Sequence, residues 1–370
     1  MTSLASQKPR RLAIVGASVR AAAESAIAAG YEVVGADLFA DADHGKSCPT
    51  TRVERYPEGL IDWLAEQEVD GWLYTGAMEN YPEVVDQMSE TAPLLGVHGN
   101  ALRRVRDPMQ LQVELAGAEV LFPETHRFDG KIPAEGDWLV KTYRHSSGAG
   151  VRVLNERAPS EGDYVQRRVS GRSAAATFAI NDKESALFGV TEQLVGAPKL
   201  HAPVWGYCGS VGPIVPSEKV ARSLVLLAEV LRSRFGLLGL VGADLVIEGD
   251  RVWLLEINPR YTASVEVLER AKGQSAIEAH VACFTGATIG SWSTQGASPH
   301  AKAILFAKQD VIISDEFHLW AMKQNAKGRV SDIPHAGESI TAGSPVVTLY
   351  GDPTVDDELI GQAERLLYAS

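Results

Sequence analysis

Cysteine is scarce in this chain: only 3 occur in 370 residues, at Cys48, Cys208 and Cys283. They stand far apart and form no CxxC pair, so neither a disulfide framework nor a zinc site is expected, and a cytoplasmic location fits. No run of about 18 apolar residues occurs, which argues against a membrane span. The opening MTSLASQKPRR also lacks the apolar stretch of a secretory signal.

Positive charge is also scarce, because 35 Lys and Arg residues face 47 Asp and Glu residues and leave a net charge of -12. This balance argues against nucleic acid as the main partner, since a phosphate backbone recruits basic residues. It does not exclude ATP, because one local basic pocket is enough for a nucleotide. Two nucleotide fingerprints are missing. The turn VGASVR is not GxGxxG, which argues against a nicotinamide dehydrogenase, and no G-K-[ST] marks a Walker A loop.

What the chain does contain is a change of pattern near its first third. Apolar runs at residues 12–15, 32–36 and 71–74 alternate with helical segments, which predicts a parallel sheet of the βαβ type. From about residue 136, short β runs with turn residues follow one another. An amphipathic helix is expected at 216–236 and a final helix at 355–369. A length of 370 residues also exceeds what one core usually supports, so two or three domains are expected.

The segment LVGADLVIEGDRVWLLEINPR, residues 240–260, reads as a buried hairpin that carries acids. Burying a bare carboxylate costs several kcal/mol unless something pairs with it. A two-residue turn with regular pairing would place Asp244 opposite Leu255 and send Glu256 to the other face. An odd-length turn or a bulge would instead bring Asp244, Glu256 and Asn258 to one face, where they would suit a divalent cation. The alternative is an edge strand with solvated acids.

A second segment, VKTYRHSSGAGVRV, places Lys141 and Arg144 before a loop of small residues, Ser146–Gly150. Such a loop can lay backbone N–H groups over phosphates, because the missing side chains allow a close approach. The two basic residues would add charge at the same place. Taken alone, the segment is equally typical of an ordinary glycine-rich hairpin.

Together, the lysine, the glycine-rich loop and the pattern D-x11-E-x-N-P-R resemble the ATP-grasp superfamily. With YTGAMENYP, WGYCGSVGP and LLEINPRYTAS, the chain is most similar to the branch described as predicted ATP-dependent carboligases. The resemblance implies an α/β fold of the α+β ATP-grasp kind in three parts. These are a Rossmann-like pre-ATP-grasp domain at 1–121, an ATP-grasp domain at 122–295 with a lid subdomain at about 136–165, and a β-rich C-terminal segment with a helix at 296–370.

The same resemblance assigns roles to single residues. It implies metal ligands at Asp244, Glu256 and Asn258, and catalytic roles for Lys141 and Arg260. Two positions depart from the family pattern: Asp107-Pro108 replaces an expected Asp-Lys pair, and the hinge QRRVSG has no acid for the ribose. The implied ATP-binding residues are Lys141, Arg144, Ser146, Ser147, Gly148, Gln166, Arg167, Arg168 and Val169.

Three further residues are expected near a substrate, because they follow strands of the predicted parallel sheet, whose carboxyl ends form ligand crevices. They are Arg20, Glu79 and Asn80; the alternative for each is a solvated loop.

The resemblance implies ATP and two Mg²⁺ ions as cofactors, with Mn²⁺ accepted in their place. The implied reaction joins a carboxylate to an amine through an acyl phosphate, yields ADP and phosphate, and belongs to amino-acid, peptide or one-carbon-cofactor biosynthesis. The expected partners are therefore a small-molecule carboxylate and an amine, without nucleic acid or membrane, and a homodimer is left open. A carboxylase of the carboxyphosphate type and a non-catalytic nucleotide-binding regulator remain alternatives.

Overall fold

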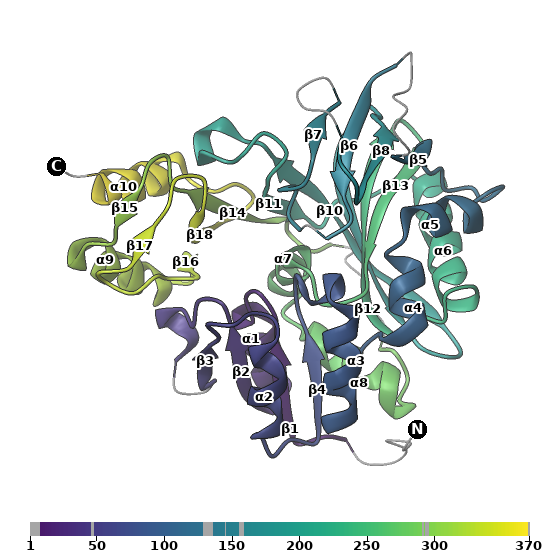
Figure 1. Cartoon of the computed structure of the whole chain (residues 1–370). Coiled ribbons are helices and arrows are strands. Elements are labelled where there is room, and N and C mark those ends of the chain that lie inside the picture. Colours follow the sequence, from purple (N-terminus) through teal and green to yellow (C-terminus); the bar gives the residue numbers. More distant parts are fainter. Residues whose placement is uncertain are drawn as a thin grey trace.

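The computed structural model describes residues 8–45, 48–128, 136–144, 146–154, 159–290, 292 and 296–368. The described chain builds four sheets: a four-stranded N-terminal sheet, an eight-stranded central sheet, a second four-stranded sheet and a two-stranded ribbon (Figure 1). The predicted lid range of 136–165 includes residues 145 and 155–158, which lie outside the described residues.

The N-terminal sheet is parallel, as its apolar runs predict, with the order β3-β2-β1-β4. Leu12, Ala13, Ile14 and Val15 of β1 have no exposed surface, as expected for a strand with helices on both faces. The loops after β1, β2 and β4 therefore meet at one edge. The strands are β1 (Arg11–Val15), β2 (Glu32–Asp37), β3 (Thr50–Arg52) and β4 (Gly71–Tyr74), with the helices α1 (Arg20–Ala28), η1 (Ala42–His44), α2 (Gly59–Ala65), η2 (Met78–Asn80), α3 (Pro82–Thr91), α4 (Gly99–Val105) and α5 (Pro108–Glu114).

The central sheet is antiparallel and runs in the order β13-β12-β9-β10-β11-β14-β18-β16. Phe178 and Ala179 of β9 lie in different hydrophobic clusters, one shared with α6 and the other with α8, so helices cover both faces. Its strands are β9 (Arg172–Ile180), β10 (Ser185–Val195), β11 (Tyr207–Gly212), β12 (Gly239–Glu248), β13 (Arg251–Asn258), β14 (His300–Phe306), β16 (Val330–Ser331) and β18 (Pro345–Gly351), and its helices are α6 (Glu218–Ser233), α7 (Ala263–Lys272) and α8 (Ala276–Thr285).

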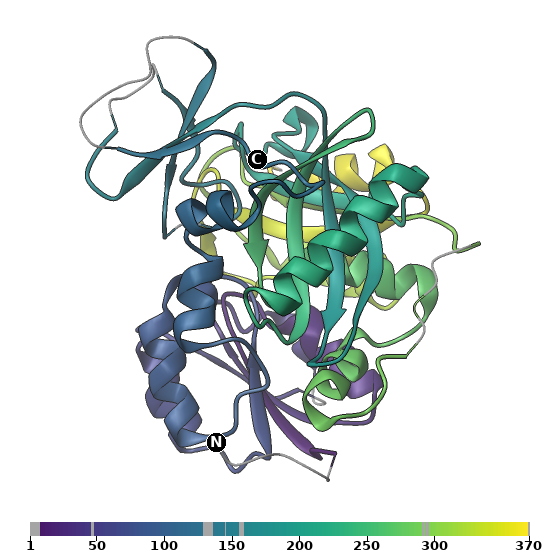
Figure 2. The ribbon, with the colours of Figure 1, turned by 90° about the vertical axis from the view of Figure 1, so that its right-hand side faces the viewer.

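The second antiparallel sheet, in the order β5-β8-β6-β7, stands out from the rest of the molecule (Figure 2). Its own core is small and consists of Trp138, Val140, Leu154 and Val165. A sheet with so few buried contacts is a region of low local stability. Its strands are β5 (Thr125–Arg127), β6 (Trp138–Thr142), β7 (Arg152–Val153) and β8 (Asp163–Arg167).

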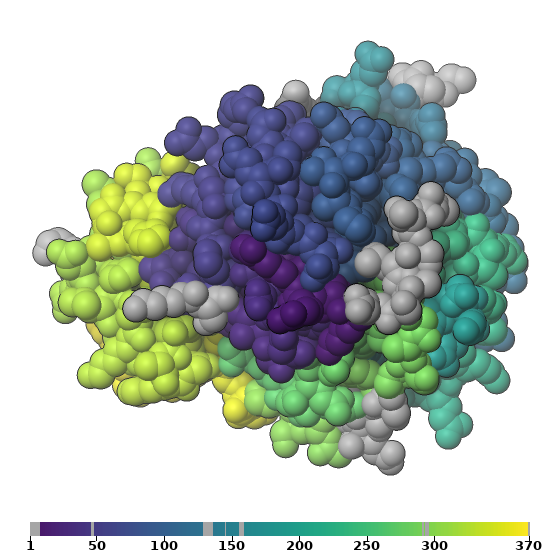
Figure 3. Space-filling model, turned by 90° about the horizontal axis from the view of Figure 1, so that it is seen from below, coloured from purple at the N-terminus to yellow at the C-terminus, as the bar shows by residue number. Residues whose placement is uncertain are grey.

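The C-terminal segment continues the central sheet, because β14 pairs with β11 and β18 pairs with β14. One of its helices, α9 (Asp315–Asn325), was not predicted, although Ser314 caps it and Asp315 and Glu316 occupy its first turn. In Figure 3 the N-terminal residues, in purple, lie between this yellow segment and parts of the chain coloured blue and green. The remaining elements are η3 (Pro198–Leu200), β15 (Val311–Ile312), β17 (Ser339–Ile340) and α10 (Asp357–Leu367).

Within the described ranges, no helix has the length and apolar character needed to cross a membrane.

The helix α6 allows a matched stability test with two neighbouring residues. Leu224 has no exposed surface, whereas the next side chain, Val225, is 56% exposed. We expect Leu224→Ala to lower the free energy of unfolding by about 2–5 kcal/mol, because it removes buried methyl groups and leaves a cavity. Val225→Ala should change it by less than roughly 0.5 kcal/mol. Urea unfolding of both variants measures the difference, and equal losses would contradict the packing described for α6.

Candidate active site

A β-bulge places the two acids of the hairpin on one face. Strands β12 and β13 are joined by a two-residue turn, with Glu248 paired to Arg251, so the odd-length turn is wrong. Pairing is regular up to Leu245 opposite Leu254, and then the register shifts so that Asp244 lies opposite Glu256. The extra residue is Leu255, which would otherwise face Asp244. The bulge alternative is therefore the one that occurs.

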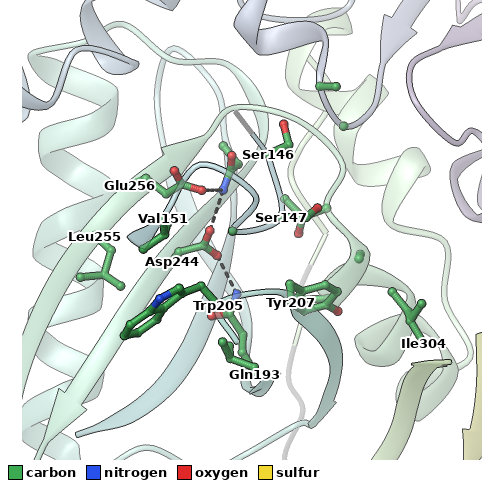
Figure 4. A pocket seen from close by; sticks show the side chains of 18 of the residues that line it. Ser146, Ser147, Val151, Gln193, Trp205, Tyr207, Asp244, Leu255, Glu256 and Ile304 are labelled. Carbon is green, nitrogen blue, oxygen red and sulfur yellow. Dashed lines mark hydrogen bonds between the residues drawn. The ribbon is translucent and has the colours of Figure 1, made fainter. Parts of the chain in front are cut away.

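The two carboxylates lie side by side and share one hydrogen-bond donor, Asn258 (Figure 4). Asn258 Nδ2 donates to Asp244 Oδ2 at 3.0 Å and to Glu256 Oε1 at 3.3 Å, and Gln193 Nε2 donates to Asp244 Oδ1 at 2.8 Å. Burial, followed by the charge of Glu256, raises the pKa of Asp244 to about 7. Because both carboxylates lie within hydrogen-bonding reach of the same amide group, they need a nearby positive charge when both are ionised.

Lys141 and Arg106 supply part of that charge. Burial lowers the pKa of Lys141, while Glu256 and Asp244 raise it, so its ammonium group lies near both acids. Arg106 Nη1 lies 3.8 Å from Glu256 Oε2 and donates to Asn258 Oδ1 at 3.2 Å. Burial disfavours the charged form of Glu256, but Arg106, a hydrogen bond with Asp244 and Lys141 outweigh it and hold the pKa of Glu256 below its usual range.

The acid pair fits a magnesium site that a nucleotide would complete. Within the part of the chain that the structure describes, no group of three or more His, Cys, Asp and Glu side chains could hold a metal ion. Mg²⁺ is usually bound by one or two carboxylates together with substrate phosphates, so two acids are sufficient. Ligation by Asn258 would require its amide to turn, because its Nδ2 now faces both acids. The described atoms thus fit Asp244 and Glu256 as ligands more directly than Asn258.

The loop Ser146–Gly150 lies against the segment that holds Trp205 and Tyr207. The Tyr207 N–H donates to the Ser147 carbonyl at 3.2 Å, and a Cβ atom on Gly148 would stand 1.9 Å from the Trp205 carbonyl oxygen. With φ at +81° as well, only glycine fits at position 148. Ser146 Oγ accepts a hydrogen bond from Asn80 Nδ2 at 2.9 Å, which ties the loop to the N-terminal sheet.

Arg260, at the end of β13, connects the acid pair with the N-terminal sheet. Its Nη2 donates to Glu79 Oε1 at 2.6 Å and lies 3.4 Å from Asn258 Oδ1. Its side chain is 12% exposed and that of Glu79 is 1% exposed. A charged pair this buried holds its geometry firmly, because breaking it would leave an uncompensated charge.

A cavity of about 780 Å³ collects most of the predicted residues, and this volume lies within the range of small-molecule sites. Two predicted residues do not line it. Arg144 lies on the surface, where it pairs with Glu83 at 3.3 Å, and Asn80 bonds Ser146 and Arg106 behind the wall. Those that line it are Arg20, Glu79, Lys141, Ser146, Ser147, Gly148, Gln166, Arg167, Arg168, Val169, Asp244, Glu256, Asn258 and Arg260.

The hinge residues form one wall of this cavity. Gln166 is 1% exposed and donates to Thr125 Oγ1 at 3.1 Å, so its side chain faces the β5-β8 pair. The Arg168 guanidinium lies 5.4 Å from the ring centre of Trp205, and both side chains line the cavity. This contact joins the hinge to the segment on which the glycine-rich loop rests.

Sequence reasoning missed four cavity or near-cavity residues: Arg106, Gln193, Lys302 and Asp41. Arg106 directly precedes Asp107-Pro108, which replaces the Asp-Lys pair of the family pattern. The missing lysine was therefore a signal to look for another basic residue nearby. Lys302 is a charged residue in a strand that is apolar from Ala303 to Phe306, which is a readable signal of a buried partner. Gln193 and Asp41 carry no such signal, because only the folded chain brings them to the cavity.

Comparison with known proteins agrees with this geometry. Residues 105–264 match the family model described as an ATP-grasp domain. This central stretch of the chain is therefore an ATP-grasp domain. Its match to the predicted carboligase branch stays a prediction.

Among curated proteins, this chain resembles the formate-dependent phosphoribosylglycinamide formyltransferase of Vibrio cholerae, with 28% identity over 174 residues. The match covers 44% of this chain and 44% of that protein, so it spans less than half of the relative's length.

Two solved structures cover almost the whole chain. An N5-carboxyaminoimidazole ribonucleotide synthetase in complex with ADP has a TM-score of 0.71 at 15% identity and covers 100% of this chain and 98% of its own. An L-amino acid ligase from Bacillus licheniformis has a TM-score of 0.71 at 13% identity and covers 98% of both chains. These similarities confirm the predicted fold.

The acid pair gives a direct prediction for Glu256→Gln. The change keeps the shape of the side chain and removes one charge from the metal site, so metal-dependent ATP turnover should fall by more than the ~10–100-fold typical of outer-shell partners. Thermal stability without ligand should fall modestly, because Arg106 and Lys141 lose a negative partner, so turnover is compared at a temperature at which both variants are folded. The matched control is Glu248→Gln in the same hairpin, where Glu248 pairs with Arg251. Turnover of Glu256→Gln equal to that of the control would contradict the metal site.

Proposed function

We propose that this chain is an ATP-dependent carboxylate–amine ligase that forms an amide through an acyl phosphate. The observation that carries the proposal is the partly buried pair Asp244–Glu256, which faces Lys141 and Arg260 across one cavity. A protein that only bound a nucleotide would need neither two adjacent acids in a cavity nor a largely buried arginine beside them. The anionic centre requires cations, and the cationic residues suit the end of a nucleotide.

In this proposal Asp244 and Glu256 hold Mg²⁺, with Asn258 as a third ligand after its amide turns. Two magnesium ions, for which Mn²⁺ substitutes, would neutralise phosphate charge when bound. Lys141 lies beside the terminal phosphates as a point charge. The backbone of Ser146–Gly150 covers the phosphates and excludes water, which would otherwise hydrolyse an acyl phosphate.

The base of ATP would lie between the hinge and the apolar part of the cavity wall. Leu139, Tyr164, Val246 and Leu255 line the cavity on that side, and Tyr164 is 7% exposed. Gln166–Val169 would offer backbone groups to the adenine. Leu255 is the extra residue of the β-bulge, and it lines the cavity. The bulge that brings Asp244 opposite Glu256 therefore also places an apolar side chain in the cavity wall.

The reaction proceeds in two balanced steps. A carboxylate oxygen of the substrate attacks the terminal phosphorus of ATP, the bond to the bridging oxygen breaks, and ADP leaves. The amine then attacks the acyl carbon, phosphate leaves with the carboxylate oxygen, and the amine loses a proton. Arg260 would stabilise the oxyanion of the tetrahedral intermediate, and Glu79 fixes its guanidinium in place.

The predicted substrate residues enter this proposal unequally. Glu79 lines the cavity beside Arg260 and is suited to contact a substrate. Asn80 acts on the glycine-rich loop through Ser146. Arg20 lines the cavity, but its guanidinium is bound by surrounding acids, so it positions the wall and does not capture a free anion.

A carboxylase of the carboxyphosphate type is the second candidate, and the fold shared with N5-carboxyaminoimidazole ribonucleotide synthetase supports it. Bicarbonate would then take the place of the carboxylate. Hydroxylamine separates the two chemistries, because it intercepts an acyl phosphate of an organic acid as a stable hydroxamate. A screen of carboxylates with hydroxylamine, followed by ADP release, therefore identifies the first substrate.

Oxygen-18 then tests the mechanism. With both carboxylate oxygens labelled, we expect one label in the released phosphate, because that oxygen bridges carbon and phosphorus in the intermediate. Unlabelled carboxylate in labelled water is the control for exchange. Label in AMP, with pyrophosphate as the other product, would show adenylation and overturn the acyl-phosphate mechanism. Label that reaches phosphate only from bicarbonate would favour the carboxylase.

A further inference from the structure

A second part of the cavity, away from the hairpin that carries the acid pair, is rich in carboxylates. It is bounded by the loops that follow β1 and β2 and by strands β14 and β18. Around Arg20 the described residues place six carboxylates against four cationic side chains. The carboxylates are Glu24, Asp37, Asp41, Asp43, Glu266 and Asp332, and the cationic side chains are Arg20, His44, Arg270 and Lys302.

The cations of this cluster are already bound by protein acids. Arg20 lies 2.6 Å from Asp332, 3.1 Å from Glu266 and 2.9 Å from Glu24. Lys302 Nζ donates to Glu266 Oε2 at 2.6 Å, with its side chain 6% exposed. An anionic substrate would have to compete with these buried pairs, and breaking one of them is strongly unfavourable.

The two remaining cations are also engaged. His44 Nε2 lies 3.5 Å from Asp37 Oδ2; burial disfavours the charged ring, but the adjacent carboxylate of Asp37 raises the pKa of His44 to about 10. Arg270 lies 3.8 Å from Glu266 and stacks on Tyr350, with its Cζ 3.5 Å from the ring centre. No guanidinium or ammonium group of the cluster is left for a phosphate.

Among the acids, Asp41 differs from the others. Asp43 accepts the backbone N–H groups of Asp332 and Ile333 at 2.9 Å each, whereas the carboxylate of Asp41 has neither a hydrogen bond nor an ion pair within the described residues. Asp41 is partly buried and lines the cavity. Burial and the neighbouring acids Asp332, Asp43 and Asp37 raise its pKa to about 8, and the positive charge of His44 offsets them only in part.

A second carboxylate oxygen, on a residue that lines the same cavity, lacks a partner. Glu79 is 2% exposed and lines the cavity; its Oε1 is bound by Arg260, but its Oε2 has no hydrogen-bond partner. A buried carboxylate oxygen without a donor costs free energy, which a ligand that donates hydrogen bonds would recover. Glu79 and Asp41 follow β4 and β2, which flank β1, so both acids lie at the same edge of the parallel sheet.

We propose that this part of the cavity binds the ammonium group of a substrate that carries no phosphate, with Asp41 as its counter-ion. The inference rests on the proposed function and specifies that one of the two substrates carries a positive charge. The nearby cavity wall from β14 and β18 contains Ile304, Val346 and Val347, which suits an alkyl or aryl chain attached to the ammonium group. The curated relative and one structural neighbour are named for phosphoribosyl compounds, so this chain would differ from them in substrate charge.

The ammonium group has two sources: the amine that attacks, or an amino group on the carboxylate substrate. Two matched pairs of probes separate them. Ethanolamine and O-phosphoethanolamine differ by a phosphate, and glutamate and glutarate differ by an ammonium group. Tyramine and putrescine extend the amine set. Calorimetric binding to the protein with Mg-ADP does not depend on turnover, so failure of the ligase reaction and failure of this inference are distinguishable.

The deciding variant is Asp41→Asn, which breaks no hydrogen bond. Binding is measured at a pH just above 8, where Asp41 is ionised in the free cavity and the ammonium group keeps its proton. We expect Asp41→Asn to weaken binding of the cationic probe at least tenfold and to raise the KM of the same substrate, while hydroxamate formation with saturating carboxylate keeps its kcat. The control Asp62→Asn makes the same change at a side chain that is 75% exposed. If Asp41→Asn weakens the binding of amines alone, the ammonium group belongs to the attacking amine. If it weakens the binding of glutamate but not of glutarate, the ammonium group belongs to the carboxylate substrate.

Three results would overturn the inference. These are tighter binding of O-phosphoethanolamine than of ethanolamine, equal affinities in Asp41→Asn and Asp62→Asn, or no binding of any cationic probe. Hydroxamate formation by the wild type would stand in each case as separate support for the acyl-phosphate reaction.

Discussion

Two partly buried carboxylates that lie side by side impose the constraint on which the site depends. Asp244 and Glu256 face each other only because Leu255 is extruded from the ladder between β12 and β13. Their repulsion, and the cost of burial, hold the pKa of Asp244 near 7. Every strongly basic residue near the pair can be understood as a response to this charge, and so can the need for bound cations.

The same constraint links segments that are distant in sequence. Arg260 joins the hairpin to Glu79 of the N-terminal sheet, and Arg106 joins it to Asn80, which in turn holds Ser146 of the glycine-rich loop. Movement of the loop is therefore coupled physically to the hairpin through a short chain of hydrogen bonds. A substrate that enters between the parallel sheet and the hairpin meets side chains from both.

Much of this could be predicted from the sequence, because it follows from local patterns. Apolar runs predicted β1 and β4, and the spacing of Asp244, Glu256 and Asn258 predicted a shared face. The bulge at Leu255 could only be offered as one of two alternatives, since nothing in the residue types distinguishes it from an odd-length turn.

Features that depend on tertiary packing could not be predicted from the sequence. Arg20 was expected to face a substrate, but Asp332 and Glu266, more than 200 residues away in the chain, bind its guanidinium. Arg144 was expected beside the phosphates and instead pairs with Glu83 at the surface. The free carboxylate of Asp41 has no local signal, because its isolation results from how its neighbours pair with one another.

The central claim is that Asp244 and Glu256 together hold a divalent cation at the end of a nucleotide. Anomalous diffraction from crystals grown with Mn²⁺ and ADP tests it most directly, because Mn²⁺ can be located without reference to the surrounding density. The account predicts a peak in contact with both carboxylates and with a phosphate oxygen, and Asn258 Nδ2 turned away from the acids. A peak elsewhere, with Asp244 and Glu256 still bound by Asn258 and Gln193, would contradict it.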